Sequence, residues 1–387
     1  MFETKGSLIL LGVALFSNLI TNSSFAEDLS FVRVDYEVEM APSKLKVGDF
    51  NGDGTEDLAV LGQTHLYSGG QLSLLLGGGD GTFGQPITFD CCGEPRSLAT
   101  GDFNVDGILD VAIPFRSVYP NPDGVAILLG SGDGTFRRGP TFFADQFDPP
   151  HNNPQFVAVG DFNGDGLPDL AVADNGSEVW ILLGTGDDRL FSPGQSFQAG
   201  SLVVSMVVSD FNRDGRLDLA VANLGSNSVS ILFGNGDGSF QPAQHFPVQN
   251  SPSSIALGDF NGDFIQDLAV GTSRSNTVSI LIGTGDGGFQ PAMSVPAGET
   301  PMFVAIGDFN GDEIEDLAVS NRVSNEVGIL LGNGDGTFQA RQGFPVGVQP
   351  MELVAGHLKK DGRLDLAVAN FSFSSHSVSV LLNDTRQ

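Results

Sequence analysis

The nine-residue segment DFNGDGLPD occupies residues 161–169, and it decides how the rest of the chain is organised. Six related copies are DFNGDGTED at 49–57, DFNVDGILD at 102–110, DFNRDGRLD at 210–218, DFNGDFIQD at 259–267, DFNGDEIED at 308–316 and HLKKDGRLD at 357–365. The last five copies begin 49 residues apart, at 161, 210, 259, 308 and 357. A second motif of the form GDGTF follows the first six copies, at Gly79, Gly132, Gly186 (as GDDRL), Gly236, Gly285 and Gly334. This regularity indicates seven units of one architecture.

Each unit is predicted to contain four short β-strands. In the unit that begins at residue 254, we expect strands over residues 254–257, 268–271, 278–282 and 293–295, separated by Gly, Asn, Asp and Pro. Apolar runs such as DLAV are nearly continuous, which indicates strands buried on both faces. Four strands in a period near 50 residues are typical of a propeller blade. The sequence therefore predicts an all-β, seven-bladed β-propeller of four-stranded antiparallel blades.

The two ends of the chain are expected to close the ring. The seventh unit ends in LLND at residues 381–384 and never reaches its second motif. Residues 30–38 occupy, in sequence, the place of an outer strand ahead of the first Asp-rich segment. We therefore predict that they pair with residues 378–382, because closure removes exposed strand edges.

These motifs resemble the FG-GAP/VCBS repeat of integrin α-subunit propellers and of many secreted bacterial proteins. The resemblance covers residues 30–383 and implies a calcium-binding propeller. Oxygen ligands at alternate positions, with a Gly that permits a sharp turn, are what a hard cation such as Ca²⁺ needs. By the family pattern, positions 1, 3, 5 and 9 of each nine-residue loop bind through their side chains and position 7 through its carbonyl. The implied ligands of about six structural Ca²⁺ ions are Asp49, Asn51, Asp53, Thr55, Asp57, Asp102, Asn104, Asp106, Ile108, Asp110, Asp161, Asn163, Asp165, Leu167, Asp169, Asp210, Asn212, Asp214, Arg216, Asp218, Asp259, Asn261, Asp263, Ile265, Asp267, Asp308, Asn310, Asp312, Ile314 and Asp316.

The seven copies are not equal as metal sites. Blades five and six place Phe264 and Glu313 where the other loops have Gly, and a positive φ would cost energy there, so we expect weaker sites. In blade seven, His357 and Lys359 replace the first two ligands, and we expect that loop to bind no metal. The Asp of each GDG motif is interpreted as part of a hairpin turn, and the Phe residues of both motifs as core between blades.

The net charge restricts the class of partner, and the amino-terminal segment indicates the compartment. The chain has 18 Lys and Arg against 47 Asp and Glu, a formal net charge of −29, which argues against nucleic acid as a partner. Lys5, an apolar run over residues 8–20 and a small-x-small end at Ala26 predict a signal peptide cleaved after Ala26. We therefore expect residues 27–387 to form one exported, monomeric propeller without a transmembrane segment, located outside the cell, in a periplasm or on the cell surface.

The ligand face is expected opposite the Asp-rich loops, over blades one to three. The extra residues of these units fall in the connections of that rim, and long loops on a rigid scaffold often carry function. The candidates are Tyr67, Cys91, Cys92, Phe115, Arg116, Tyr119, Phe143, Phe147 and His151. Exposed aromatic residues with an Arg are a common anchor composition. Two adjacent cysteines exclude a disulfide framework, and they leave open a vicinal disulfide, a reduced pair or an intermolecular link.

Three functions remain open from the sequence. We expect a calcium-binding module that binds or adheres to a glycan or an extracellular protein, and not an enzyme. No nucleophile elbow, HExxH, P-loop or dinucleotide motif is present in the sequence. The alternatives are a catalytic, lyase-like propeller that acts on polysaccharide through His65, His151 or Arg116, and a structural component of the cell surface.

Overall fold

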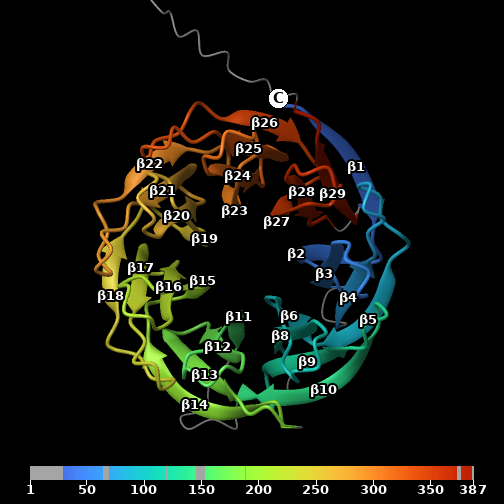
Figure 1. Ribbon diagram of the computed structural model, residues 1–387, viewed down its shortest axis with the longest axis vertical. Helices are drawn as coiled ribbons and strands as arrows, with labels where there is room; N and C mark the ends of the chain where they lie inside the picture. The colour runs from blue at the N-terminus through green and yellow to red at the C-terminus, as the bar shows by residue number, and fades with distance from the viewer. Residues whose placement is uncertain are drawn as a thin grey trace, which may run out of the picture.

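The computed structural model describes residues 29–63, 69–117, 121–144, 153–187, 189–372 and 376–385. Within these ranges, 29 strands form seven antiparallel sheets that stand around a central axis like the blades of a propeller (Figure 1). The prediction of an all-β, seven-bladed propeller is therefore confirmed. The predicted signal peptide, residues 1–26, lies outside the described residues.

The strands of blade one are β2 (Ala41–Gly48), β3 (Asp57–Gln63), β4 (Gly70–Leu75) and β5 (Ile87–Cys92). Blade two contains β6 (Glu94–Pro95), β7 (Ala99–Gly101), β8 (Asp110–Arg116), β9 (Gly124–Gly130) and β10 (Phe136–Phe143). Its inner strand is divided into β6 and β7, which both pair with β8. Pro95 lies at the break, where it has no backbone N–H for the ladder.

Blade three contains β11 (Pro154–Gly160), β12 (Asp169–Asp174), β13 (Glu178–Gly184) and β14 (Phe191–Gln198). Blade four contains β15 (Val203–Ser209), β16 (Asp218–Asn223), β17 (Ser228–Leu232) and β18 (Gln244–Pro247). Blade five contains β19 (Pro252–Gly258), β20 (Asp267–Thr272), β21 (Thr277–Leu281) and β22 (Met293–Pro296). Blade six contains β23 (Pro301–Gly307), β24 (Asp316–Asn321), β25 (Glu326–Leu330) and β26 (Gln342–Pro345).

Blade seven combines both ends of the chain. Its strands are β27 (Pro350–Gly356), β28 (Asp365–Asn370), β29 (Ser377–Asn383) and, as the outer strand, β1 (Phe31–Glu37). The register of β1 with β29 runs from Phe31 opposite Asn383 to Glu37 opposite Ser377. The predicted closure of the ring by an N-terminal strand is confirmed.

The blades pack through the Phe residues of the two motifs. Rings of consecutive blades meet edge to face, as in Phe162 with Phe240, whose centroids are 5.6 Å apart, and Phe260 with Phe338, at 5.5 Å. The second strand of each blade is buried on both faces, and every residue of β20 is buried. This arrangement confirms that the Phe residues are core and explains why the apolar runs do not alternate. Among the described residues, none forms a helix with the length and apolarity that crossing a membrane requires.

The Asp-rich loops and the GDG turns lie on one rim of the ring. Each Asp-rich loop joins the first and second strands of a blade, and each GDG turn joins the third and fourth, so both follow the same edge of an antiparallel sheet. The turn of one blade bonds to the loop of the blade before it, as when the amide of Gly238 donates to the carbonyl of Phe162 at 3.0 Å. In the turns, an Asp accepts from the residue two positions on, which confirms the hairpin interpretation: Asp80 Oδ1 accepts from the amide of Thr82 at 3.0 Å.

Candidate metal centre

Each intact Asp-rich loop is a compact turn held by its own side chains. In blade three, the carboxylate of Asp161 accepts hydrogen bonds from the amides of Gly164 at 2.8 Å, Asp165 at 3.1 Å and Gly166 at 2.9 Å. Asn163 Oδ1 accepts from the amide of Asp165, and Asn163 Nδ2 donates to the Asp165 carboxylate, both at 2.9 Å. The predicted ligand positions 1, 3 and 5 are therefore gathered within one turn at the rim of the blade.

Position 9 has a structural role that the sequence pattern did not suggest. Asp169 is fully buried, and its two oxygens accept from the amides of Phe162 at 2.8 Å and Gly184 at 2.7 Å. The other intact loops repeat these two bonds with Asp57, Asp110, Asp218, Asp267 and Asp316. The Asp at position 9 thus links the loop to the end of the third strand.

Two positions of the loop require a positive φ. The Gly at position 6 has φ of 83° in Gly166, and in blades five and six the same conformation is imposed on Phe264 (φ 60°) and Glu313 (φ 65°). The expected backbone strain in these two loops is therefore present. Position 4 has the same requirement, which the sequence analysis missed: Val105 (φ 59°) and Arg213 (φ 60°) occupy it in blades two and four.

Negative charge accumulates in the intact loops. Burial raises the pKa of the carboxyl group at position 9, and the carboxylates at positions 1 and 5 raise it further, against the lowering effect of two backbone amides. The pKa reaches about 6 in Asp110, Asp218 and Asp267 and about 7 in Asp316. The carboxylates at positions 1 and 5 are thus close enough to disfavour ionisation of the carboxyl group at position 9.

The residues present fit a hard cation by chemistry. Each intact loop offers three carboxyl groups, an amide oxygen and a carbonyl, and all of these are oxygen donors of the kind that Ca²⁺ prefers. Within the described residues, no group of three or more His, Cys, Asp and Glu side chains lies close enough to hold a metal ion in this conformation. The carboxylate at position 1 accepts hydrogen bonds from backbone amides, as Asp161 does. The intact loops also contain, among the described residues, a single side-chain ion pair, between Arg216 and Asp214 at 3.7 Å.

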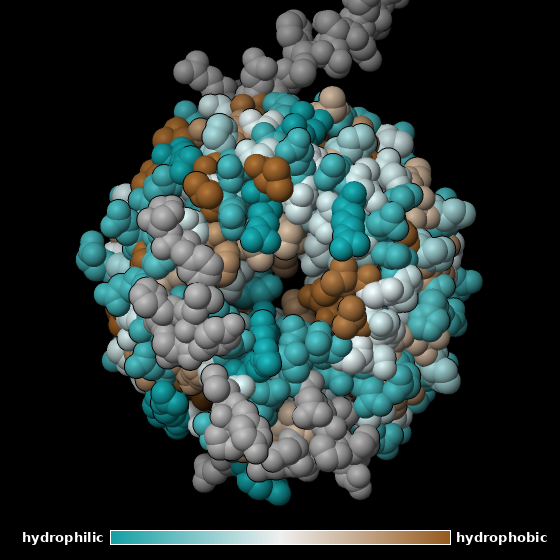
Figure 2. Space-filling view, turned by 180° about the vertical axis from the view of Figure 1, so that it is seen from behind, coloured by the Kyte–Doolittle hydropathy of each residue, from teal (hydrophilic) through white to brown (hydrophobic). Residues whose placement is uncertain are grey.

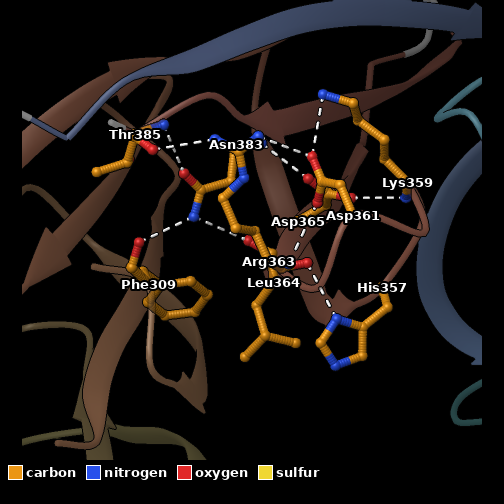
Figure 3. Close-up of polar contacts among 9 residues, drawn as sticks. All are labelled: Phe309, His357, Lys359, Asp361, Arg363, Leu364, Asp365, Asn383 and Thr385. Atoms are coloured by element: carbon orange, nitrogen blue, oxygen red, sulfur yellow. Dashed lines mark hydrogen bonds and ion pairs between the residues drawn. The ribbon is translucent and has the colours of Figure 1, made fainter. Parts of the chain in front are cut away.

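The loop of blade seven carries its own cations (Figure 3). The ammonium group of Lys359 lies 3.1 Å from the carboxylate of Asp361, and the guanidinium of Arg363 lies 2.9 Å from the same carboxylate. His357, at position 1, bonds through Nδ1 to the carbonyl of Arg363 at 3.0 Å. Asp365 keeps the clamp at position 9, where it accepts from the amides of Lys359 and Asn383 at 2.8 Å.

The predicted ligand face is only partly described. Tyr67, Tyr119, Phe147 and His151 lie outside the described residues, as does His65 of the catalytic alternative, so their candidacy stays a prediction. Of the others, Arg116 is exposed at the end of β8 and Phe143 is half-buried at the end of β10.

Three candidates of that face were assigned wrongly. Phe115, in the second strand of blade two, is only 6% exposed, so it is no exposed anchor. Cys91 and Cys92 are not in a connection but end β5, where Cys92 pairs with Gly70. Cys91 is buried, and both thiols are free, with sulfur atoms 3.0 Å apart.

Lys360 is a functional neighbour that sequence reasoning missed. Its ammonium group donates to Thr55 Oγ1 at 3.0 Å, so blade seven places a positive charge beside the loop of blade one. Hydrogen bonds from Asn51 and Thr55, together with this charge, lower the pKa of Asp53. No local signal could have revealed the contact, since the two residues are 305 positions apart.

Comparison with known proteins supports the fold and the repeat. Among the curated proteins, none matches this sequence. A lectin of Agrocybe aegerita, described as recognising non-reducing terminal N-acetylglucosamine, is 16% identical, with a TM-score of 0.56 over 92% of this chain and 96% of the lectin. A periplasmic gluconolactonase of Pseudomonas aeruginosa, PpgL, is 16% identical, with a TM-score of 0.59 over 86% of this chain and 89% of the enzyme. BBS1N, solved in complex with ARL6DN, is 13% identical, with a TM-score of 0.63 over 91% and 96%.

At these identities the structures share the propeller fold alone. The FG-GAP-like repeat, in contrast, matches the sequence itself, over residues 49–113, 117–172, 161–221, 210–270, 259–319 and 308–368. These six matches cover most of the chain and contain all six intact Asp-rich loops. The chain belongs to the FG-GAP repeat family.

Proposed function

We propose that this FG-GAP propeller is an exported calcium-binding module that binds or adheres to an extracellular glycan or protein. Calcium would have a structural role at the rim of the Asp-rich loops. The opposite rim, with its longer connections, would carry the ligand. A separation of this kind leaves the ligand surface free to vary while the scaffold stays constant.

One observation carries the calcium proposal, namely the difference between the intact loops and the loop of blade seven. Where His357 and Lys359 replace two oxygen ligands, side-chain cations neutralise the remaining carboxylate of Asp361. In the loop of blade six, Asp308, Asn310 and Asp312 have no side-chain cation paired with them within the described residues. The loop of blade six therefore has oxygen ligands for a cation, whereas the loop of blade seven has side-chain cations of its own.

The residues that would hold each ion are those at positions 1, 3 and 5, the carbonyl at position 7 and the carboxyl group at position 9. In blade three these are Asp161, Asn163, Asp165, Leu167 and Asp169. A bound Ca²⁺ supplies positive charge that compensates these carboxylates. The chain itself supplies the turn: the amides that now bind Asp161 fix where its carboxylate lies.

The face seen from behind Figure 1 agrees with a binding role. Figure 2 shows a hollow at the centre of the ring and separate apolar patches among polar residues. Leu202 and Leu224, which are 38% and 37% exposed, lie in connections of the rim opposite the Asp-rich loops. Apolar side chains that gather on an otherwise polar surface can mark an interaction site.

The test has two arms on the mature protein, residues 27–387. Metal analysis after dialysis against calcium should give about six ions per chain, and a glycan array in calcium should identify a bound glycan that is lost with a chelator. A count near zero would contradict the calcium proposal. Turnover of a polysaccharide or lactone by the purified protein would instead support the enzyme alternative.

A further inference from the structure

A cavity of about 550 Å³ opens at the seam between blades three and four. Its walls are the connection from β14 to β15, the turn from β16 to β17 and the outer strand β18. These segments lie on the rim opposite the Asp-rich loops, because they join the other ends of the strands. The volume is within the range of about 300–1,000 Å³ that small-molecule sites occupy.

The seam cavity is lined by residues without charged side chains, and its surface combines a larger apolar part with a smaller polar one. The residues described in its walls include no Asp, Glu, Lys or Arg; they are Ser177, Gln198, Ala199, Gly200, Ser201, Ser226, Asn227, Ser228, His245 and Pro247. Hydroxyl, amide and imidazole groups therefore provide the polar contacts, and Ala199 and Pro247 provide apolar surface. A lining of this chemistry suits a neutral, hydroxyl-rich ligand and gives an anion no partner.

The tautomer of His245 follows from its hydrogen bonds. Ser230 Oγ donates to the carbonyl of Ala199 at 3.0 Å, and it accepts from Asn223 Nδ2 at 2.8 Å. The same oxygen lies 2.8 Å from His245 Nδ1. Because a hydroxyl group has one proton, which Ala199 receives, all three contacts coexist only if His245 carries its proton on Nδ1. In the neutral imidazole the Nε2 atom is then an acceptor, and no hydrogen bond to it is found among the described residues.

The contact does not make Ser230 a nucleophile. Ser230 is fully buried, and its proton is directed to a backbone carbonyl rather than to the imidazole. A reacting carbonyl could not reach its oxygen, so the pair is read as a support for His245. Positioning of an exposed imidazole by a buried side chain is a common way to orient a binding group.

The walls are held in place before any ligand arrives. Asn227 has a positive φ of 51°, and its Oδ1 accepts from the amide of Ser251 at 2.8 Å, which leaves its Nδ2 group as a donor. The amide of Gly225 donates to the carbonyl of Ser201 at 2.8 Å, which joins the turn to the connection. At Gly200 a Cβ atom would lie 2.4 Å from Asn223 Oδ1, so only glycine fits over this buried amide.

A second seam shows that the fold repeats the cavity but not its chemistry. Between blades six and seven a cavity of about 570 Å³ has Arg33, Asp35 and Glu37 in its wall. Asp35 occupies the place of His245, because it lies opposite Ser379 as His245 lies opposite Ser230. There Ser379 Oγ donates to Asp35 Oδ1 at 2.6 Å, and Asp35 pairs with Arg33 at 2.7 Å. The outer strand thus decides whether a seam is charged or neutral.

We propose that the cavity between blades three and four binds a neutral pyranose unit of an extracellular glycan. A sugar hydroxyl donates to His245 Nε2, and sugar oxygens accept from the amide of Asn227 and from the serine hydroxyls. The apolar side of the ring packs on Pro247. This inference rests on the proposed binding role and specifies its ligand class and its site. The site borders the predicted sector over blades one to three and extends beyond it to blade four.

The experiment titrates the calcium-loaded mature protein with the methyl glycosides of glucose, galactose, mannose and N-acetylglucosamine. Methyl glucuronide serves as the charged counterpart, and binding is measured by calorimetry and saturation-transfer NMR. At least one neutral glycoside should bind, and more tightly than the glucuronide. Nitrogen-15 NMR of the imidazole should show the Nδ1–H tautomer and a shift of the Nε2 signal on binding.

Two variants assign the site. His245→Ala should weaken the affinity about tenfold, the change that corresponds to about 1.4 kcal/mol. Ser226→Trp, at an exposed turn residue, should block the cavity. The matched control is Ser294→Ala, the equivalent outer-strand position of blade five, opposite Ser279, which should leave the affinity unchanged.

The outcomes separate this inference from the proposed function. If neutral glycosides bind but neither variant at the cavity weakens them, the site assignment is wrong and the binding role stands. If only the glucuronide or a protein partner binds, the neutral-sugar inference is overturned. Melting temperature and calcium content, measured for every variant, show whether a lost affinity reflects lost folding.

Discussion

The Asp-rich loops of blades six and seven have the same place in the fold and different electrostatics. Both join the first strand of a blade to the second, and both end in a fully buried Asp, Asp316 or Asp365, that clamps two backbone amides. In blade six, Asp308 and Asp312 stand without a side-chain cation among the described residues. In blade seven, Lys359 and Arg363 both contact Asp361 (Figure 3).

The difference teaches that the turn and its charge are separable. The clamp and the positive φ at position 6 persist in blade seven, where Gly362 has φ of 86°. The clamp and the positive φ at position 6 therefore do not depend on the Asp at position 1 or the Asn at position 3. At positions 1 and 3, blade six has oxygen ligands for an external cation, whereas blade seven has a positively charged side chain of its own. Substitutions in either loop can test this contrast.

The largest expected effect is that of calcium removal. Binding to the native state alone adds about 2.7 kcal/mol per site when the free ion is at about 100 times Kd, so six sites should dominate the free energy of unfolding. Scanning calorimetry of the mature protein should show a much lower melting temperature with chelator than in millimolar calcium. An unchanged melting temperature, with sodium chloride matched, would refute the calcium proposal for the six loops.

The next effect concerns blade seven, which is closed by strand pairing. Deleting residues 27–37 removes β1 and leaves the edge of β29 exposed, so unfolding should lose cooperativity and the protein should tend to aggregate. Arg33→Ala is the control, since it removes one exposed ion pair with Asp35 and keeps the ladder. A truncated protein that melts in one sharp transition and stays soluble would show that closure is unimportant.

Single substitutions should then distinguish the two kinds of loop. Asp161→Ala should lower the calcium count by one, and in calcium it should destabilise the fold by about the 2.7 kcal/mol of one site. His357→Ala should leave the count unchanged, because we expect the loop of blade seven to bind no ion. Metal analysis by mass spectrometry, combined with a melting curve, measures both, and a loss of calcium in the His357 variant would remove the contrast.

Restoring oxygen ligands at positions 1 and 3 should convert the loop of blade seven into a calcium site. In the double variant His357→Asp with Lys359→Asn, position 1 gains a carboxylate and position 3 an amide, while Asp361 loses one cation partner. We expect a seventh calcium ion, together with lower stability in chelator because Asp361 keeps only Arg363. Lys360→Gln, outside the ligand positions, should keep the count at six.

The smallest effect concerns the strained loops of blades five and six. Phe264 is 88% exposed, so Phe264→Gly removes little packing and relieves a left-handed conformation that costs about 1–2 kcal/mol. The flexibility of glycine in the unfolded chain offsets roughly 0.5–1 kcal/mol of this gain. Chemical denaturation should therefore show a gain of up to about 1 kcal/mol. Gly215→Ala, at φ of 82° in blade four, should change stability in the opposite direction.

Much of the candidate metal centre was predictable, because its members lie within nine consecutive residues. The turn, the positive φ at Phe264 and Glu313 and the altered loop of blade seven are all local consequences of residue type. The double clamp of Asp316 was not predictable, since one of its partners, Gly332, comes 16 positions later and is fixed only by sheet pairing. The burial of Phe115 was missed because burial depends on how the strands pack in three dimensions, which a local pattern does not record.

The repeat alone determines the blade number, the strand order and the closure of the ring. Each unit carries its own strands, turns and apolar runs, and strand periodicity and turn chemistry act over a few residues. Only the packed ring brings Lys360 to Thr55 and His245 to a buried serine beside the connection from blade three. Such sites combine residues of different blades, whose distances depend on how the sheets stack, and no local pattern records that stacking.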